Sequence, residues 1–499
     1  MDEAVKEHRH EVPKSLILLT VIIGTFLGRL DQTIVNLALP RIIQDYSITV
    51  SSAGWIATAY ILANAIFVPV WGKLGDTLGR KKIYILGFTI FIIGSILAGL
   101  AWNFSSMIVF RVIQAIASSA DYPTAMAIIA VTFKENRERA QALGIWSASF
   151  AVAAVFGPLI GGPLIDNFGW RSVFLINLPI GIIGLLMAIA FIHESRSPQK
   201  PKAFDLKGAI ILGISLSALV LVLDKGQDWG WLSLNSIISY LVTIVSLLIF
   251  IKVEKNHKDP IVDLNFFKNK IFVQTLINNF VIFMGMMGSV FLIPIFAQTF
   301  LGYDATATGY LFMPMAACMM IASPLGGLLT GKVQPKYIIV ISTAVAAIGF
   351  FIFSFLDPRS TSWDIIFPLG IMAFGMGFGM AQRTNIIAAV VPSKEIGIAS
   401  SILALARNIA GAFGIAIFGS LLSSTIENNM IQMSQLSSFN GKSPAEYGQF
   451  VSLITLKAQI NGYHTVFITS AFIVLIGAIL AFSIGKINMK PGVKVHVEA

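Results

Sequence analysis

Two carboxylates and one arginine stand inside long apolar runs of this sequence, where ionised side chains are rare. Asp31 lies in the run Leu30–Pro40, and Asp121 follows Arg111 by ten residues in another run. An ionised side chain within a bilayer is costly, so it commonly faces a cavity and has a function. A carboxylate there can take up and release a proton, and a nearby arginine favours its ionised form. Asp31, Asp121 and Arg111 are therefore the candidate proton-coupling residues.

Each of these charges also has a structural interpretation. Asp31 could be a permanent partner of Arg29, although residues two apart do not face each other on a helix. Arg111 could extend to a membrane interface and only anchor its helix. Asp121 could bind a cationic substrate or a second proton, or it could pair with Arg29 or Arg407. The sequence leaves these alternatives open.

A short polar segment between two apolar runs, Gly72–Lys82 with the sequence GKLGDTLGRKK, combines small residues with charges. Glycines let backbones approach closely. An aspartate–arginine pair can hold one arrangement of neighbouring helices and break in another. The segment predicts a conformational gate on the cytoplasmic side, with a solvated basic loop as the alternative. The predicted gate residues are Gly72, Gly75, Asp76, Gly79 and Arg80.

The composition indicates that membrane-spanning helices position these residues. The chain has 499 residues, of which 56% are hydrophobic and 12% charged, and its mean hydropathy is +0.80. A soluble chain would carry about a quarter charged residues. The net charge of +10 does not indicate nucleic-acid binding, because the cations are spread between the apolar runs. The single cysteine, Cys318, excludes a disulfide framework.

Fourteen apolar runs are long enough to cross a bilayer, which takes about 20 residues for each helix. Most lysines and arginines fall in the two tails and in every second connection, which predicts that both termini are cytoplasmic. The expected spans are 15–38, 53–71, 83–101, 105–131, 140–165, 172–192, 207–224, 235–252, 272–300, 305–331, 336–356, 363–390, 399–427 and 464–485.

Polar, basic stretches around the seventh and eighth runs divide the chain into six, two and six spans. A weak similarity between the two sets of six supports two related halves. The predicted parts are a cytoplasmic N-terminal tail, a six-helix bundle, a linker with two extra transmembrane helices, a second six-helix bundle and a cytoplasmic C-terminal tail. They cover residues 1–14, 15–192, 193–271, 272–485 and 486–499.

Several of these segments resemble the major facilitator superfamily, in particular its fourteen-helix drug:proton antiporters. Gly72–Lys82 is similar to the family's loop between helices 2 and 3, with Thr77 where a cation is usual. Leu30–Pro40 is similar to the signature LDxTIVNVALP and departs only at Leu37. The run that begins at Arg111 resembles the R-x-x-Q-G-x-G proton-transfer motif of the family, with alanines in place of both glycines.

The fifth expected span resembles the antiporter motif G-x-x-x-G-P-x-x-G-G, with Ala153 in place of the first glycine. Its glycines give a smooth face for close helix crossing, and its proline loosens the helix. The segment Trp170–Gly181 matches WRxxFxxNxPxG of the same family. Together with the other signatures, these motifs favour exchange over symport. The motif residues are Gly157, Pro158, Gly161 and Gly162.

The resemblance implies an all-α membrane protein with the major facilitator fold, in which 14 transmembrane helices form two six-helix bundles plus two inserted helices. It implies proton-coupled antiport that exports amphipathic or cationic drugs and toxic compounds by alternating access. A dedicated exporter of one metabolite, lipid or siderophore is the alternative. The sequence has no phosphate loop, metal-ligand spacing or catalytic constellation, so an enzyme, a cofactor and a metal are not expected.

The expected partners are small-molecule amphipathic substrates, protons and the lipid bilayer of the cell membrane, without nucleic acid and with the chain as a monomer. Polar and methionine side chains inside spans are candidates for a substrate cavity, since flexible methionines suit a binder of many shapes. Ordinary packing is the alternative for the methionines. The cavity candidates are Gln32, Asn36, Gln114, Met284, Gln298 and Arg407.

Overall fold

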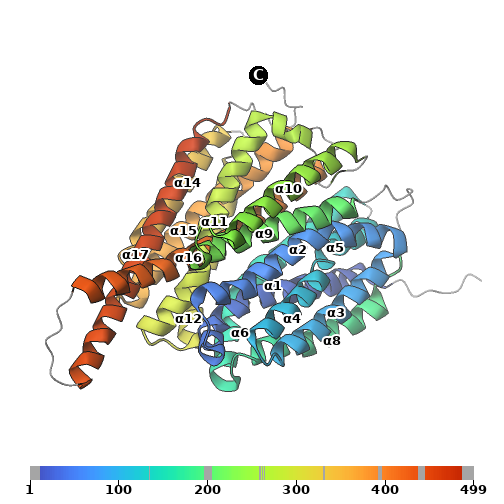
Figure 1. Cartoon of the computed structure of the whole chain (residues 1–499). Coiled ribbons are helices and arrows are strands. Elements are labelled where there is room, and N and C mark those ends of the chain that lie inside the picture. The colour runs from blue at the N-terminus through green and yellow to red at the C-terminus, as the bar shows by residue number, and fades with distance from the viewer. Residues whose placement is uncertain are drawn as a thin grey trace, which may run out of the picture.

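The computed structural model describes residues 12–133, 135–195, 205–257, 260, 262, 264–329, 332–391, 396–436 and 444–485. Within these ranges the secondary structure is helical, and the helices run side by side in two bundles (Figure 1). The first bundle contains α1 (Lys14–Tyr46), α2 (Val50–Leu78), α3 (Arg80–Gly99), α4 (Phe104–Ser118), α5 (Asp121–Thr132), α6 (Asn136–Phe168), α7 (Ser172–Leu175) and α8 (Asn177–Phe191).

Two further helices and a second bundle follow. The pair α9 and α10 pack against each other, and α9 also contacts α2 of the first bundle and α16 of the second. These elements are α9 (Leu206–Trp229), α10 (Leu234–Asn256), the 3-10 helix η1 (Leu264–Lys268), α11 (Lys270–Phe300), α12 (Ala305–Leu311), α13 (Met313–Leu328), α14 (Pro335–Phe353), α15 (Ser362–Ala389), α16 (Ile396–Leu436) and α17 (Pro444–Ala481).

Polar contacts at the helix ends show which helices of the first bundle run in the same direction. At the start of α1, Lys14 pairs with Glu138 near the start of α6, with 2.7 Å between Nζ and Oε2. At the end of α1, the hydroxyl of Tyr46 donates to the carbonyl of Ala101, which follows α3. Thus α1, α3 and α6 run in the same direction. We call the side that holds Lys14 the termini side and the opposite side the far side.

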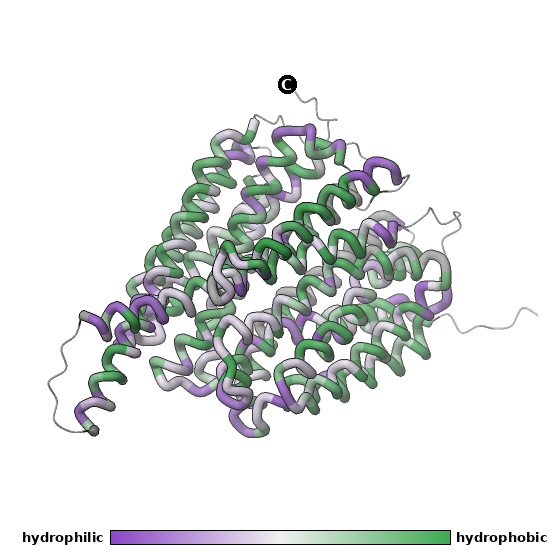
Figure 2. Tube along the Cα trace, in the orientation of Figure 1, coloured by the Kyte–Doolittle hydropathy of each residue, from purple (hydrophilic) through white to green (hydrophobic). Residues whose placement is uncertain are grey.

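Twelve helices of the described chain are long and apolar enough to cross a membrane, and Figure 2 shows hydrophobic residues along most of the helices. The expected spans 105–131 and 140–165 are not among the twelve. The first is divided at Ser119–Ala120 into α4 and α5. The second lies in α6, where several side chains fall outside the described part of the structure. Fourteen crossings therefore remain a prediction.

Two helices are longer than the expected spans 399–427 and 464–485. The helix α16 has 41 residues and α17 has 38. At 1.5 Å per residue each is about 60 Å long, about twice the hydrocarbon thickness of a bilayer. Both therefore extend beyond the far side of the bundle, where Figure 1 shows the end of α16 and the start of α17 projecting from the other helices.

The hydrophobic clusters that combine residues of both bundles lie toward the far side and in mid-membrane. There, one cluster combines Ile34 and Leu37 of α1 with Phe291 and Phe296 of α11. Toward the termini side, the first bundle has its own cluster, which includes Phe88 of α3, and the second bundle has another, formed by α11, α14, α15 and α17. The described structure is therefore closed between the bundles on the far side.

Candidate functional site

A buried polar network joins four helices of the first bundle. Arg111 of α4 pairs with Asp31 of α1, with 2.6 Å between Nη1 and Oδ2. The amides of Gln114 and Asn177 both donate to Asp31 Oδ1, each at 2.9 Å. The same two amides also donate to the hydroxyl of Ser95 on α3, at 2.6 and 2.7 Å. Every member of the network is almost inaccessible to solvent.

Aromatic rings enclose the arginine of this network. The guanidinium carbon of Arg111 lies 4.1 Å from the ring centre of Tyr60 and 5.6 Å from that of Phe174. Such cation–π contacts are favourable where water is excluded. Arg111 thus points into the bundle and does not extend to an interface, and the partner of Asp31 is Arg111 and not Arg29. The role of this pair in proton coupling stays a prediction.

Asp121, at the start of α5, lies apart from this network. Its Oδ2 accepts a hydrogen bond of 2.6 Å from Thr25, whose hydroxyl in turn accepts one from the indole of Trp146. Its Oδ1 is buried and has no hydrogen-bond partner. A Cβ at Gly24 would lie 2.9 Å from this oxygen, so the missing side chain of Gly24 makes room for the carboxylate. Of the ion pairs between described residues, none includes Asp121.

Arg29 of α1 and Arg407 of α16 belong to opposite bundles. Arg29 donates to Gln32, with 3.1 Å between Nη1 and Oε1, and it lies within electrostatic range of Asp121. Arg407 of α16 lies over the ring of Phe283, with 5.6 Å to its centre, and is within electrostatic range of Arg29 and of Tyr122, which is 43% exposed.

The remaining cavity candidates are distributed differently. Gln114 belongs to the buried network, and Met284 is buried where α11 packs against α16, since a side chain at Gly414 would collide with its carbonyl. Gln298 donates across the bundles to the carbonyl of Leu37, at 3.1 Å. Asn36 is half-buried on α1.

The predicted gate segment lies at the end of α2 and the start of α3. A Cβ at Gly72 would lie 3.3 Å from Pro123, and one at Gly75 would lie 3.3 Å from Thr124, so both glycines allow α2 to pack closely on α5. Gly79 has a φ of +118°, a conformation that favours glycine. The backbone N–H of Arg80 donates to the carbonyl of residue 195 at 3.0 Å.

The side chain of Asp76 lies outside the described part of the structure. The predicted Asp76–Arg80 latch therefore stays a prediction.

The glycine motif of α6 brings two sets of helices together. Side chains at Gly157 and Gly161 would collide with Thr33 and Ile34 of α1, and a side chain at Gly162 would collide with the backbone of Thr306 in α12. The motif therefore serves packing within the first bundle and contact with the second.

Hydrogen bonds strengthen this contact between the bundles. Asp166 accepts bonds from the backbone N–H of Thr306 at 2.9 Å and of Ala305 at 3.1 Å. A side chain at Gly309 of α12 would collide with the carbonyl of Pro158, so the proline of the motif also lies at the contact. The sequence did not single out Asp166, because an aspartate at a helix end is common.

Comparison with known proteins places this architecture in a family. The sequence profile of the Major Facilitator Superfamily matches residues 21–415. This chain belongs to the major facilitator superfamily. It is a multi-pass membrane protein, and its family points to transport rather than to enzymatic catalysis.

Named relatives of this superfamily member are bacterial. The Multidrug transporter protein MdtP of Bacillus subtilis is 30% identical over 95% of this chain and 94% of its own length. The Multidrug resistance protein Stp of Mycobacterium tuberculosis is 30% identical over 83% of this chain and 78% of its own. The Riboflavin transporter RibZ of Clostridioides difficile is 31% identical over 85% and 92%.

A solved structure supports the major facilitator fold. The bacterial homologue of the human lysosomal transporter Spinster superposes with a TM-score of 0.68, at 19% identity, over 94% of this chain and 96% of that chain.

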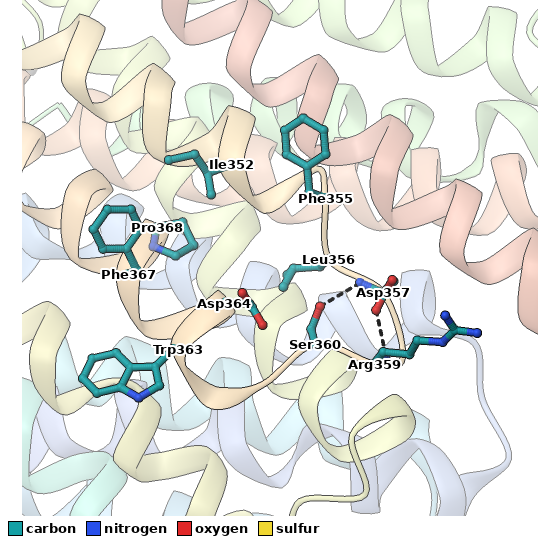
Figure 3. A pocket seen from close by; sticks show the side chains of 10 residues that line it. All are labelled: Ile352, Phe355, Leu356, Asp357, Arg359, Ser360, Trp363, Asp364, Phe367 and Pro368. Atoms are coloured by element: carbon teal, nitrogen blue, oxygen red, sulfur yellow. Dashed lines mark hydrogen bonds between the residues drawn. The ribbon is translucent and has the colours of Figure 1, made fainter.

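A pocket of about 580 Å³ lies within the second bundle of this major facilitator protein, on the far side between the end of α14 and the start of α15 (Figure 3). Its apolar wall includes Phe355, Trp363 and Phe367, which are all more than half exposed. Its polar wall includes Asp357 and Arg359. All of its lining residues lie between Ile352 and Pro368, so this pocket belongs to one connection of the second bundle and is not where the two bundles meet.

Proposed function

We propose that this chain exports amphipathic compounds from the cytoplasm in exchange for protons, by alternating access across the cytoplasmic membrane. The relatives named for multidrug transport and resistance, at 30% identity over most of the chain, support the export of drugs and toxic compounds. The termini side is cytoplasmic in this proposal, in agreement with the distribution of lysine and arginine in the sequence.

The observation that carries the proposal is the position of the buried carboxylates in bundles whose hydrophobic cores are shared on the far side and separate toward the termini side. The shared core and the Asp166–Thr306 contact close the far side, whereas the cores are separate toward the termini side. This arrangement supports an inward-open state of a transporter whose bundles rock against each other. The two bundles correspond to residues 15–192 and 272–485, and the helices of 193–271 complete fourteen crossings.

Asp121 is the best candidate to carry the proton. Its Oδ1 is buried without a partner, and a buried charge is costly unless it is paired and hydrogen-bonded. Binding a proton removes that charge and supplies a donor. Asp31 is already paired with Arg111, so a proton on Asp31 would break the pair and loosen the packing of α1 against α4. In this scheme the Asp31–Arg111 pair responds to the state of the transporter, and the Asp76–Arg80 latch holds the inward-closed state.

A transport assay with a matched variant tests the proposal. Full-length protein in proteoliposomes exports a panel of fluorescent amphipathic compounds under an imposed pH gradient, with and without a proton ionophore. We expect ionophore-sensitive export by the wild type and its loss in Asp121→Asn. Glu427→Gln removes an exposed carboxylate of α16 and should export normally. Export that is insensitive to the ionophore overturns the coupling, and normal export by Asp121→Asn overturns the role of that residue.

The Riboflavin transporter RibZ, 31% identical to this chain, supports a second candidate: a dedicated carrier of a single metabolite on the same fold. Competition separates the two functions. Mutual inhibition among chemically unrelated compounds favours the multidrug exporter, whereas inhibition by one compound and its close analogues favours the dedicated carrier.

A further inference from the structure

The pocket between α14 and α15 opens at the level where lipid head groups lie. It has a volume of about 580 Å³, and its aromatic wall comes from both helices: Phe355 follows α14, and Trp363 and Phe367 belong to the first turns of α15 (Figure 3). Trp363 is 73% exposed. An exposed tryptophan at a helix end is typical of the membrane interface. The pocket is therefore within reach of the lipids that surround the second bundle.

One face of α14 leads from this pocket along the bilayer. Its exposed apolar and aromatic residues are spaced by four, seven, three and four positions, which places them on one side of a helix. They are Tyr337, Ile341, Ile348, Phe351 and Phe355. Other sides of α14 pack against α15 and α17, so this face is the one that contacts lipid. An acyl chain can lie along it while the head group of the same lipid lies in the pocket.

The charged residues of the pocket are two carboxylates and one arginine. Asp364 lies nearer to Trp363, and Arg359 lies at the other end of the pocket (Figure 3). Asp357 Oδ1 accepts a bond from the backbone N–H of Arg359 at 2.7 Å, and Asp364 Oδ2 accepts bonds from the N–H and the hydroxyl of Thr361 at 2.7 and 2.9 Å. Of the ion pairs between described residues, none includes these three charged side chains. The pocket can therefore receive a ligand that carries charges of both signs.

We propose that this pocket binds a phospholipid whose head group carries a primary ammonium, such as phosphatidylethanolamine, from the leaflet on the far side. The ammonium donates hydrogen bonds to the carboxylate of Asp364 beside the indole of Trp363, whose ring face also attracts a cation. The guanidinium of Arg359 binds the phosphate, since its planar fork matches a phosphate with two parallel hydrogen bonds. An acyl chain continues past Phe355 along the exposed face of α14.

Three phospholipids with the same acyl chains and different head groups test the proposal. Phosphatidylethanolamine carries a primary ammonium, phosphatidylcholine a quaternary ammonium without an N–H, and phosphatidylglycerol no cation. Each lipid is titrated against delipidated full-length protein in detergent, and native mass spectrometry measures the fraction of protein with bound lipid. We expect phosphatidylethanolamine to bind about fivefold more tightly than the other two, the upper range for one exposed charge pair.

Substitutions separate the two ends of the head group. Asp364→Asn keeps an oxygen for the N–H of Thr361 and removes the negative charge, so it should remove most of the preference, whereas Asp364→Glu should retain it. Arg359→Gln should weaken all three lipids about fivefold and keep the preference, because the phosphate is common to them. Glu427→Gln removes an exposed carboxylate of α16 outside the pocket and should change none of the affinities.

Two results would overturn the proposal: binding of phosphatidylethanolamine that is no tighter than that of the other two lipids, or a preference that survives unchanged in Asp364→Asn. An equal loss of preference in Glu427→Gln would also overturn it, because the net charge of the protein and not this pocket would then determine the affinity. Lipid binding and export are measured separately, so the failure of either one leaves the other in place.

Discussion

At the scale of single residues, Asp31 and Arg111 each make the burial of the other possible. A charge without its partner in such a site is strongly unfavourable, and removing one partner of a buried pair costs about 3–5 kcal/mol. We therefore expect Asp31→Asn to lower the free energy of unfolding by about that amount, because Arg111 then remains buried among Tyr60, Gln114 and Phe174 without a carboxylate. Unfolding in detergent, followed by tryptophan fluorescence, measures the change.

The double variant Asp31→Asn/Arg111→Gln provides the control for this prediction. It removes both charges and should recover a large part of the lost stability, although not transport, because the neutral pair cannot respond to a proton. A double variant as unstable as Asp31→Asn alone would show that hydrogen-bond geometry, and not charge, stabilises the network.

The sequence predicted part of this network. Asp31, Arg111 and Gln114 belong to motifs, so their importance was visible, but their mutual contact was not, because 80 residues separate Asp31 from Arg111. Asn177 lies within the motif of Trp170–Gly181, but the sequence suggested no role for its side chain. Ser95 gave no signal, since a serine in an apolar run is common and only the packing of α3 against α4 makes it a partner.

At the scale of elements, closure of the far side depends on the absence of a side chain at Gly162. A Cβ there would lie 2.7 Å from the backbone nitrogen of Thr306, and a backbone cannot rotate away as a side chain can. Gly162→Ala should therefore separate α6 from α12 and shift the protein toward a state open on the far side. Labelling by an impermeant maleimide of Gln298→Cys, in a Cys318→Ser background, should become about tenfold faster, which corresponds to about 1.4 kcal/mol.

A matched glycine provides the comparison for this substitution. A Cβ added at Gly448 of α17 would meet no atom within 4 Å, so Gly448→Ala should leave the labelling rate unchanged. Equal rates in the Gly162→Ala and Gly448→Ala proteins would mean that α6 and α12 adapt without opening.

The inserted helix α9 is attached to the first bundle by a buried carboxylate. Asp224 accepts hydrogen bonds from the hydroxyl of Ser51 and from the indole of Trp55, the latter at 2.6 Å, and both donors are on α2. Trp55→Phe keeps an aromatic ring and removes one donor, so it should cost about 1–3 kcal/mol of unfolding free energy. Thermal unfolding in detergent measures it, with Trp363→Phe at an exposed position as the control. A loss no larger than that of the control would contradict the prediction.

Element positions were more predictable than element lengths. Hydropathy located the apolar runs, because lipid contact requires apolar side chains whatever the details of packing. It could not show that α16 and α17 continue as helices beyond the far side, since polar residues are compatible with a helix in water. Nor could it show the break between α4 and α5, which falls at Ser119–Ala120, where the side chain of Ala120 lies close to Gly87 of α3.

At the scale of the whole molecule, exchange of an anion for a proton moves charge across the membrane. An anion that leaves and a proton that enters both carry positive charge inward, so a monoanion exchanged for one proton moves two charge equivalents. Each is worth about 2.3 kcal/mol per 100 mV. Under the proposed proton exchange, an interior-negative potential should therefore accelerate export of an anionic dye such as fluorescein even without a pH gradient, whereas exchange of a monocationic dye for one proton would be electroneutral.

A potassium diffusion potential tests this coupling directly. Proteoliposomes loaded with potassium and fluorescein, diluted into low potassium with valinomycin at equal pH on both sides, should release the dye several-fold faster than without valinomycin, because about 100 mV contributes roughly 4–5 kcal/mol to the exchange. If release is independent of the potential while a pH gradient still drives it, the exported species is electrically balanced by the protons that enter, and anion export by one-for-one exchange is excluded.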